Sequence, residues 1–454
     1  MQQDPGFFSG ILLFVLLTLA GIACLYLSSN HRTTVRFQTK LFVCAISLRF
    51  LMSLIIYEFG LVNILKDEDA SGWVMGVSLY KEWLRKRIEI WDLPSVLTGA
   101  FAGQHHGYGF LVGTLFYLTD MPDRLAAAAL NCLIGALTVV LVYRIARSLF
   151  SESVAVKSAW WACLLPSMLI WSSQTLKEPT IIFLETVVMY GCIRLKLSGF
   201  SLRHVIACAL AIVLVLPFRF YAAYIAGAAI AVALVMPQFG KRKMGVLPAI
   251  CIALCLIPIS GIFGQSEAQI ERFDLEHVQK FRQGIAKDSG SGVTSSYDLK
   301  SPSGLVMATL VGGAHLMLAP FPWQLGGGSV RMILTTPELL VWWWLFFVGV
   351  APGLWYAVRH RFGDIQPMLF FIFGLGLLYS MMFGNVGLAY RQRAQLLPWL
   401  LIFAMVGLEQ RAIKRARNKT AAQKDPKAKD IPQSQPQPPF SPQTQPQSLP
   451  QPSV

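Results

Sequence analysis

Apolar runs alternate with short polar segments along almost the whole chain. A helix needs about 20 apolar residues to cross a bilayer, and about eleven runs approach that length. They lie at 7–27, 42–64, 124–146, 154–173, 179–197, 202–218, 220–237, 245–263, 338–357, 366–383 and 394–410. Two shorter apolar runs, 105–118 and 304–320, are expected to be re-entrant or interfacial. The pattern predicts an all-α polytopic membrane protein.

The basic residues between these runs predict the orientation of the chain. Loops such as "HRTTVRFQTK", "YRIARSLF" and "RHRF" fall on one side if the spans alternate, and short basic loops face the cytoplasm. We therefore expect an outer N-terminus, a cytoplasmic C-terminus and an odd number of crossings in a bacterial cytoplasmic membrane. The first run follows "MQQDPG", which lacks the basic residues of a cleaved signal peptide, so this helix is expected to be retained.

Two long outer segments, 65–123 and 264–337, interrupt the spans. In the first, "YKEWLRKRIEIW" (80–91) has an apolar helical face opposite a basic one, which predicts a helix lying on the outer membrane surface. The apolar face would be formed by Tyr80, Trp83, Leu84, Ile88 and Trp91. The second segment contains "DSGSGVTSS", which is too rich in Gly and Ser to be regular throughout.

The end of the chain differs from the rest. Residues 1–410 are expected to form one membrane domain, whereas the segment from 411 onward is first basic and then mainly Pro and Gln. Such a composition cannot bury a core. We predict a disordered cytoplasmic tail over 411–454.

Composition supports the membrane assignment and excludes other classes. Hydrophobic residues make up 54% of the chain, charged residues only 14%, and the mean hydropathy is +0.52. The net charge of +15 comes mostly from loops between apolar runs, as membrane topology requires, so we expect no nucleic-acid binding. The eight Cys lie mainly inside apolar runs without paired spacing, which is typical of small core residues rather than of disulfides or a zinc site.

The most informative residues are charges at the predicted outer helix ends. They are the acids Asp67, Glu68 and Asp69, the pair Lys177–Glu178, and the arginines Arg219, Arg391 and Arg393. Outer arginines oppose the usual charge bias of membrane proteins, which suggests that they bind an anion. His105 and His106 are interpreted as headgroup or packing contacts. Within the spans, Arg49 is expected to extend toward the cytoplasm and Glu58 to face the helix bundle.

Acids and arginines at an outer membrane surface suit one reaction in particular. Transfer of a sugar from a lipid phosphate needs a carboxylate to take the proton of an acceptor hydroxyl, and cations to stabilise the departing phosphate. Arginine suits the second task because its fork donates two hydrogen bonds to phosphate oxygens. The donor's lipid tail would lie between helices.

Several motifs, distributed over about residues 60–408, resemble the GT-C superfamily of polyprenyl-phosphate-sugar glycosyltransferases. "DASGW" (69–73) resembles the start of the family's first outer loop, although Trp73 stands where Tyr is usual. A second stretch comprises residues 123–179, "DRLAAAALNCLIGALTVVLVYRIARSLFSESVAVKSAWWACLLPSMLIWSSQTLKEP". In it, one helix is expected to end in "YRIARSLF", and the next ends in "P…WS" before an acid. "APFPW" (319–323) and "GNVGLAYRQRAQLLPWLLI" resemble later segments of dolichyl-phosphate-mannose mannosyltransferase-like proteins.

The resemblance implies a role for each of the charged residues. Asp69 would be the base that activates the acceptor, with Glu68 and Asp67 as its alternatives. Glu178 would position the acceptor or bind a divalent cation, Mg²⁺ or Mn²⁺, together with Asp69. The donor phosphate would be held by Arg219, Arg391 and Arg393, and more weakly by Lys177. The extra N-terminal span is atypical for the family.

The leading hypothesis is therefore an inverting glycosyltransferase with a polyprenyl-phosphate-linked sugar donor. The acceptor would be an extracytoplasmic glycan, lipid or protein. A surface-polysaccharide polymerase or ligase that uses a lipid-diphosphate donor is an alternative enzyme. A lipid-linked sugar transporter or flippase is an alternative of another class, which predicts polar groups near the bilayer midplane and repeat symmetry.

Overall fold

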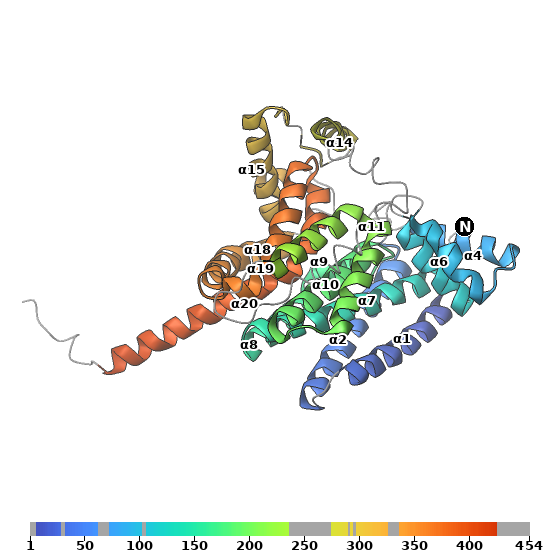
Figure 1. Cartoon of the computed structure of the whole chain (residues 1–454), viewed down its shortest axis with the longest axis horizontal. Helices are drawn as coiled ribbons and strands as arrows, with labels where there is room; N and C mark the ends of the chain where they lie inside the picture. Colours follow the sequence, from blue (N-terminus) through green and yellow to red (C-terminus); the bar gives the residue numbers. More distant parts are fainter. Residues whose placement is uncertain are drawn as a thin grey trace, which may run out of the picture. The chain divides into compact units, whose positions relative to one another are not determined.

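The computed structural model describes residues 6–28, 32–61, 72–101, 106–235, 274–288, 291–293, 297–325 and 336–424. Every regular element in these residues is helical, apart from one isolated bridge between Gly292 and Asn385 (Figure 1). The all-α prediction is therefore confirmed for this part of the chain. The predicted span 245–263 and the acids Asp67, Glu68 and Asp69 lie outside it.

Six of the described helical runs are long and apolar enough to cross a membrane. They are Phe7–Ser28, Thr34–Glu58, Arg124–Leu149, Leu202–Ala231, Thr336–Met381 and Val386–Thr420, and the bent pair Glu152–Leu164 and Pro166–Ser172 makes a seventh candidate. These runs confirm a polytopic membrane protein. The two parts of the bent pair, α8 and α9, meet at 56°.

Two pairs of predicted spans are joined in the structure. The predicted spans 202–218 and 220–237 both fall in α11 (Leu202–Val235), which is kinked at Arg219. The predicted spans 338–357 and 366–383 fall in the continuous run of α18 (Thr336–Trp344), the π-helix η4 (Leu345–Val350) and α19 (Ala351–Met381), with non-helical backbone at Arg361. Helical periodicity continues through these breaks because single residues, rather than loops, change the chain direction.

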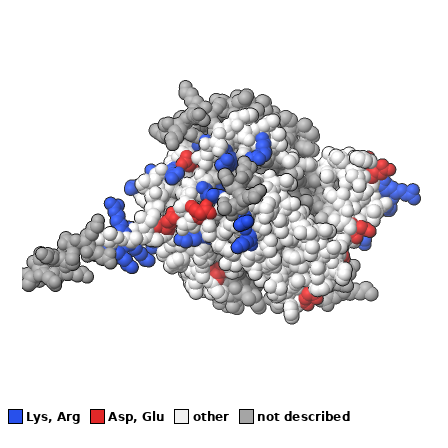
Figure 2. Space-filling model, turned by 90° about the horizontal axis from the view of Figure 1, so that it is seen from below, with Lys and Arg blue, Asp and Glu red and all other residues white. Residues whose placement is uncertain are grey.

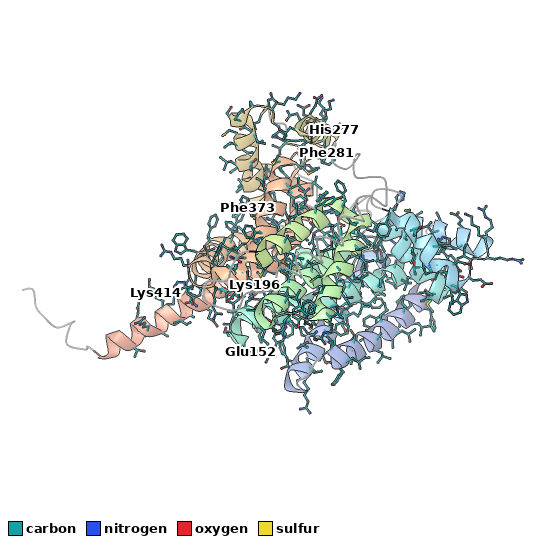
Figure 3. The ribbon with its side chains drawn as sticks, viewed as in Figure 1. Glu152, Lys196, His277, Phe281, Phe373 and Lys414 are labelled. Atoms are coloured by element: carbon teal, nitrogen blue, oxygen red, sulfur yellow. The ribbon has the colours of Figure 1, made fainter. Side chains whose placement is uncertain are left out.

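Helix α7 (Arg124–Leu149) lies at the centre of the first helices. It packs against α1 (Phe7–Ser28), α2 (Arg32–Glu58), α8 (Glu152–Leu164) and α10 (Glu178–Ser198) (Figure 1). Its alanines Ala126–Ala129 are fully buried, so neighbouring backbones can approach closely. The outward faces of other spans carry apolar side chains such as Phe373 on α19, which is 70% exposed (Figure 3). These faces are suited to contact with lipid.

Glu58, at the end of α2, is exposed rather than turned toward the bundle. The prediction for this residue was wrong, because Tyr57 and Ile56 occupy the buried face at this level of the helix. A carboxylate at a helix end can remain hydrated, so nothing in the sequence pattern required it to be buried.

Helix α20 (Val386–Lys424) contacts the α18–α19 run through glycines. A Cβ atom at Gly353 would overlap the carbonyl oxygen of Phe403, and one at Gly407 would overlap that of Gly349. Gly349 and Gly353 form a GxxxG pair, which allows two helix backbones to touch. Pro352 cannot donate to the Val348 carbonyl, which accounts for the π-helical turn beside the contact.

The chain divides into two compact units, Met1–Glu409 and Gln410–Val454. The described part of the second unit, Gln410–Lys424, belongs to α20, and its residues 411–420, which are rich in Lys and Arg, are exposed. Residues 425–454 lie outside the described part.

Gly353→Ala should destabilise the protein by about 1–3 kcal/mol, because the added methyl group overlaps a backbone atom that cannot move independently. Thermal unfolding in detergent would measure the loss. Gly363→Ala, on the same helix, is the matched control, because a Cβ there meets nothing within 4 Å. An equal effect of the two substitutions would contradict the close helix contact.

Candidate functional site

Three of the predicted site residues meet inside the helix bundle. Glu178 Oε1 lies 3.1 Å from Arg219 Nη2 and 3.7 Å from Arg391 Nη1. Glu178 begins α10, Arg219 lies at the kink of α11, and Arg391 is on the first turns of α20. Helices that are distant in sequence therefore bring two guanidinium groups to one carboxylate oxygen.

The kink in α11 places Arg219 in this cluster. Pro217 lacks the N–H that would bond the Val213 carbonyl, and Arg219 has extended backbone angles (φ −154°, ψ 91°). The Arg219 side chain is buried, and its Nη1 donates to the Tyr379 hydroxyl at 2.9 Å. That hydroxyl in turn donates to Gln395, so the network extends to α19 and α20.

The directly contacting groups carry two positive charges and one negative charge. Glu178 is fully buried, Arg219 is 6% exposed and Arg391 is 13% exposed. Glu178 Oε2 has no hydrogen-bond partner within the described residues. Two guanidinium groups therefore share one carboxylate oxygen in a site that is shielded from water. Arg391 also lies over the Trp171 ring, 5.7 Å from its centroid.

The segment between α9 (Pro166–Ser172) and α10 leads directly into Glu178 and is almost entirely buried. Irregular backbone inside a membrane protein needs hydrogen-bond partners from the protein itself. Side chains from α2 and α7 supply them.

Arg49 supplies the first of these contacts. Its Nε donates to Ser172 Oγ at 2.8 Å, and its Nη2 donates to the Ala162 carbonyl at 3.3 Å. Ala162 would normally bond the N–H of the residue four positions later, but that residue is Pro166. Arg49 was expected to extend to the cytoplasmic surface, but the side chain is 1% exposed and does not reach water, because it satisfies the carbonyl freed where α8 ends.

Ser53 and Tyr57 continue the same stripe of α2 at helical spacing. Ser53 Oγ donates to the Ser173 carbonyl at 2.6 Å, and the Tyr57 hydroxyl accepts from the Thr175 N–H at 3.1 Å. Residues four positions apart lie on one helix face. One face of α2 therefore lies along the segment between α9 and α10 and forms hydrogen bonds with it.

Asn131 on α7 holds the same segment from a second direction. Its Nδ2 donates to the carbonyls of Gln174 and Leu176, at 2.5 and 2.8 Å. Leu176 lies two residues before Glu178, so this amide helps to fix where α10 begins.

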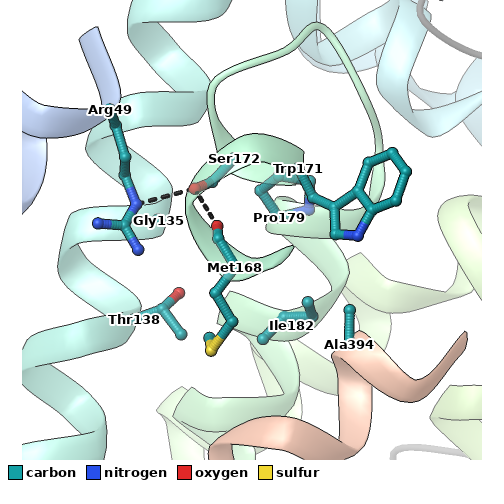
Figure 4. A pocket seen from close by; sticks show the side chains of 9 residues that line it. All are labelled: Arg49, Gly135, Thr138, Met168, Trp171, Ser172, Pro179, Ile182 and Ala394. Carbon is teal, nitrogen blue, oxygen red and sulfur yellow. Dashed lines mark hydrogen bonds between the residues drawn. The ribbon is translucent and has the colours of Figure 1, made fainter. Parts of the chain in front are cut away.

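A small cavity lies between Arg49 and Trp171 (Figure 4). Its lining is mostly apolar and consists of Arg49, Gly135, Thr138, Met168, Trp171, Ser172, Pro179, Ile182 and Ala394. In Figure 4, Arg49 is bonded to Ser172 on one side, and Trp171 stands on the other. The cavity therefore borders the charged cluster through Pro179, next to Glu178, and through Trp171.

Arg393 lies in a different environment from Arg391. Its Nη1 donates to the carbonyls of Met317 and Ala319, at 3.2 and 3.0 Å, at the end of α15 (Pro302–Leu318). The Arg393 guanidinium also lies 4.7 Å from the Tyr390 ring centroid. These contacts satisfy backbone groups at a helix C-terminus, which is a structural use of the residue.

Fewer contacts describe the positions of the other predicted site residues. Lys177 directly precedes α10 and is partly buried. His106 precedes α6 (Gly107–Thr119) without capping it through its side chain, and His105 lies outside the described residues. The ring centroid of Trp73, four residues after Asp69 in the sequence, lies 6.0 Å from the Arg124 guanidinium.

No group of three or more His, Cys, Asp or Glu residues in the described part is placed to hold a metal ion. Two guanidinium groups lie against Glu178 Oε1, and their positive charge opposes the approach of a divalent cation to this oxygen.

Sequence reasoning missed Tyr379, Gln395 and Glu185. Glu185 lies on α10, about two turns after Glu178, and is 1% exposed. Neither of its carboxylate oxygens has a hydrogen-bond partner among the described residues. An acid inside an apolar run was a signal that could have identified it. Tyr379 and Gln395 gave no such signal, because single polar residues are common in membrane helices.

No family model matches the chain, and no curated protein matches it. The structure is similar to the crystal structure of an oligosaccharyltransferase from Archaeoglobus fulgidus, tethered to an acceptor peptide. Identity is 15% and the TM-score is 0.45, over 81% of this chain and 49% of the other. The chain thus spans about half the length of that protein, and a likeness of this size assigns it to no family.

Asn131→Leu should loosen the segment before Glu178, because it leaves the buried Leu176 carbonyl without this donor and leaves the Gln174 carbonyl with only the Leu176 N–H, at a cost of about 2 kcal/mol. Amide hydrogen exchange of residues 172–177 should become faster. Thr138→Val on the same helix is the control, since that hydroxyl bonds only the Ile134 carbonyl of its own helix. Unchanged exchange in Asn131→Leu would show that the amide does not hold the segment.

Proposed function

We propose that this chain is an integral-membrane glycosyltransferase of the inverting type. It would move a sugar from a polyprenyl-phosphate donor to the hydroxyl of an extracytoplasmic glycan, lipid or protein. The observation that carries the proposal is the buried contact of Arg219 and Arg391 with Glu178 Oε1. An anionic headgroup attached to a lipid is the kind of ligand that can reach such a cluster from within a membrane.

The phosphate would take over part of the contact that Glu178 makes now. A guanidinium fork can bond two phosphate oxygens, and its attraction for charge is strong where water is excluded. Arg391 is better placed than Arg219 to bind the phosphate, because it is less buried and makes the longer contact with Glu178. Glu178 would then orient the arginines in the free protein.

The reaction would be a single displacement. The acceptor oxygen attacks the anomeric carbon, and its proton passes to a carboxylate base. The bond between that carbon and the phosphate oxygen breaks, and the electron pair leaves with the phosphate, which the arginines stabilise. Asp69 is the proposed base, with Glu68 and Asp67 as its alternatives.

The proposal is tested by incubating the purified, reconstituted chain with polyprenyl-monophosphate and polyprenyl-diphosphate sugars and following sugar transfer. Transfer from the monophosphate donor is expected. Transfer from the diphosphate donor alone would favour a polymerase or ligase, and no transfer from either would contradict the proposed reaction.

Arg391→Gln should lower kcat/KM for the lipid donor by about 10²–10³-fold, because a donor to the leaving phosphate is lost. Arg391→Lys should recover only part of the activity, since an ammonium lacks the planar fork. Arg361→Gln is the control, because Arg361 pairs with Asp364 at an exposed position. Equal activity of Arg391→Gln and the wild type would remove Arg391 from the donor site.

Asp69→Asn should abolish transfer while leaving expression and donor binding intact, because an amide cannot accept the acceptor's proton. Transfer and donor binding would be measured on the same membranes. If the variant keeps full activity, Asp69 is not the base, and Asp67→Asn and Glu68→Gln become the deciding substitutions.

A further inference from the structure

The segment Leu84–Trp91, here named the elbow, exposes basic and apolar side chains together. It follows α4 (Gly72–Arg85), the helix that precedes η2 (Ile90–Asp92). Arg85, Lys86 and Arg87 are all exposed, as are Ile90 and Trp91, the latter by 85%. Large apolar side chains beside cations are typical of membrane-interface segments.

The elbow differs from the single amphipathic helix predicted over 80–91. Helix α4 ends at Arg85, and its buried aromatic residues Tyr80 and Trp83 pack toward α6. The Trp83 ring lies 6.1 Å from that of Phe110 on α6. The apolar face of α4 is thus already covered by protein, whereas Leu84 and Trp91 are not.

Hydrogen bonds fix the shape of the elbow. The Ile88 N–H bonds the Trp83 carbonyl at 3.0 Å, and the Arg87 N–H bonds the Leu84 carbonyl at 3.1 Å. These two bonds form a Schellman motif, and the contact of Ile88 with the cluster around Trp83 completes it. Tyr117 on α6 also donates to the Ile88 carbonyl. The exposed side chains therefore project from an ordered backbone.

Arg87 occupies an unusual position in this motif. Its φ of 50° is in the left-handed region, where helix ends normally carry Gly or Asn. A residue with a Cβ atom at such a position costs backbone stability, and residues of this kind are concentrated at functional sites.

Only some of the charged side chains of the elbow have an oppositely charged partner. Lys86 pairs with Glu82 at 2.6 Å, and the side chains of Glu89 and Asp92 form the capping box of η2. Within the described residues, Arg85 and Arg87 form no ion pair within 4 Å, although Arg85 is near Glu82, the partner of Lys86. Figure 2 shows Lys and Arg side chains projecting on this side of the protein, with Asp and Glu side chains next to them.

The neighbours of α6 place the elbow near a bilayer surface. Helices α4 and α6 have 14 and 13 residues, too few to cross. Helix α6 packs with residues near one end of α1, α7 and α10, namely Leu13, Ala126, Ala127 and Ile181 (Figure 1). The pair therefore lies at the level where membrane-spanning helices end.

We propose that the elbow is a docking surface for anionic phospholipid headgroups of the adjacent leaflet. Arg85 and Arg87 bind the lipid phosphates, and Ile90 and Trp91 enter the boundary between headgroups and acyl chains. This inference is independent of the proposed glycosyl transfer, because it rests on a different surface and its test needs no activity.

The test compares amide hydrogen exchange of residues 84–93 in the full chain, reconstituted in two kinds of nanodisc. One kind contains phosphatidylcholine alone and the other contains phosphatidylglycerol in addition. Exchange is expected to slow by about tenfold in the anionic discs. The double variant Arg85→Gln/Arg87→Gly should lose this difference.

The double variant is designed to fold. Glycine adopts the left-handed conformation at position 87 without strain, so the thermal midpoint in detergent should be equal to or higher than that of the wild type. Lys280→Gln/Lys287→Gln on α14 (Leu275–Asp288) removes the same number of exposed positive charges and should keep the full response to phosphatidylglycerol.

Three results would overturn the proposal. The first is exchange that is independent of phosphatidylglycerol. The second is an equal response of the elbow variant and the α14 variant, which would indicate a bulk charge effect. Slowed exchange in phosphatidylcholine discs with free inorganic phosphate would assign the elbow to a soluble anion instead.

Discussion

Backbone groups that are freed where a helix breaks inside this bundle must find partners within the protein, because lipid offers none. The break between α8 and α9 frees the Ala162 carbonyl, and Arg49 donates to it. The segment after α9 is held by Ser53, Tyr57 and Asn131. The end of α15 is satisfied by Arg393, Trp342 and Trp343, whose side chains donate to the carbonyls of Met317, Leu318 and Ala319. Polar side chains therefore lie where the backbone is irregular.

This requirement also positions the charged cluster. Because the segment before α10 is hydrogen-bonded on two sides, Glu178 enters the bundle at a fixed place. The kink at Pro217 then allows Arg219 to meet it, and the start of α20 brings Arg391. Burying these charges is costly unless each has a partner. The cluster therefore brings two guanidinium groups to one oxygen of Glu178, and Glu185 on the same helix adds a second buried carboxyl group.

Small residues make this arrangement sterically feasible. A Cβ at Gly135 would lie 2.7 Å from both Arg49 Nε and Ser172 Cβ, so only glycine lets α7 pass so close to the break. Gly353 and Gly407 have the same role between α19 and α20, and α20 carries both Arg391 and Gln395. These glycines thus allow the helices to approach closely enough for their polar side chains to form hydrogen bonds and ion pairs.

The sequence by itself determined the class of the protein, the positions of most helices, and the set of charges worth examining, because long apolar runs and charges at their ends are local features. It could not decide which charges meet. Arg391 and Arg393 are two residues apart and looked equivalent, yet side chains at that spacing point to opposite sides of a helix. Packing turned Arg391 toward Glu178 and Arg393 toward the end of α15. The environments of Arg49 and Glu58 were also decided by tertiary structure, because each depends on which neighbouring helix is present and where that helix breaks.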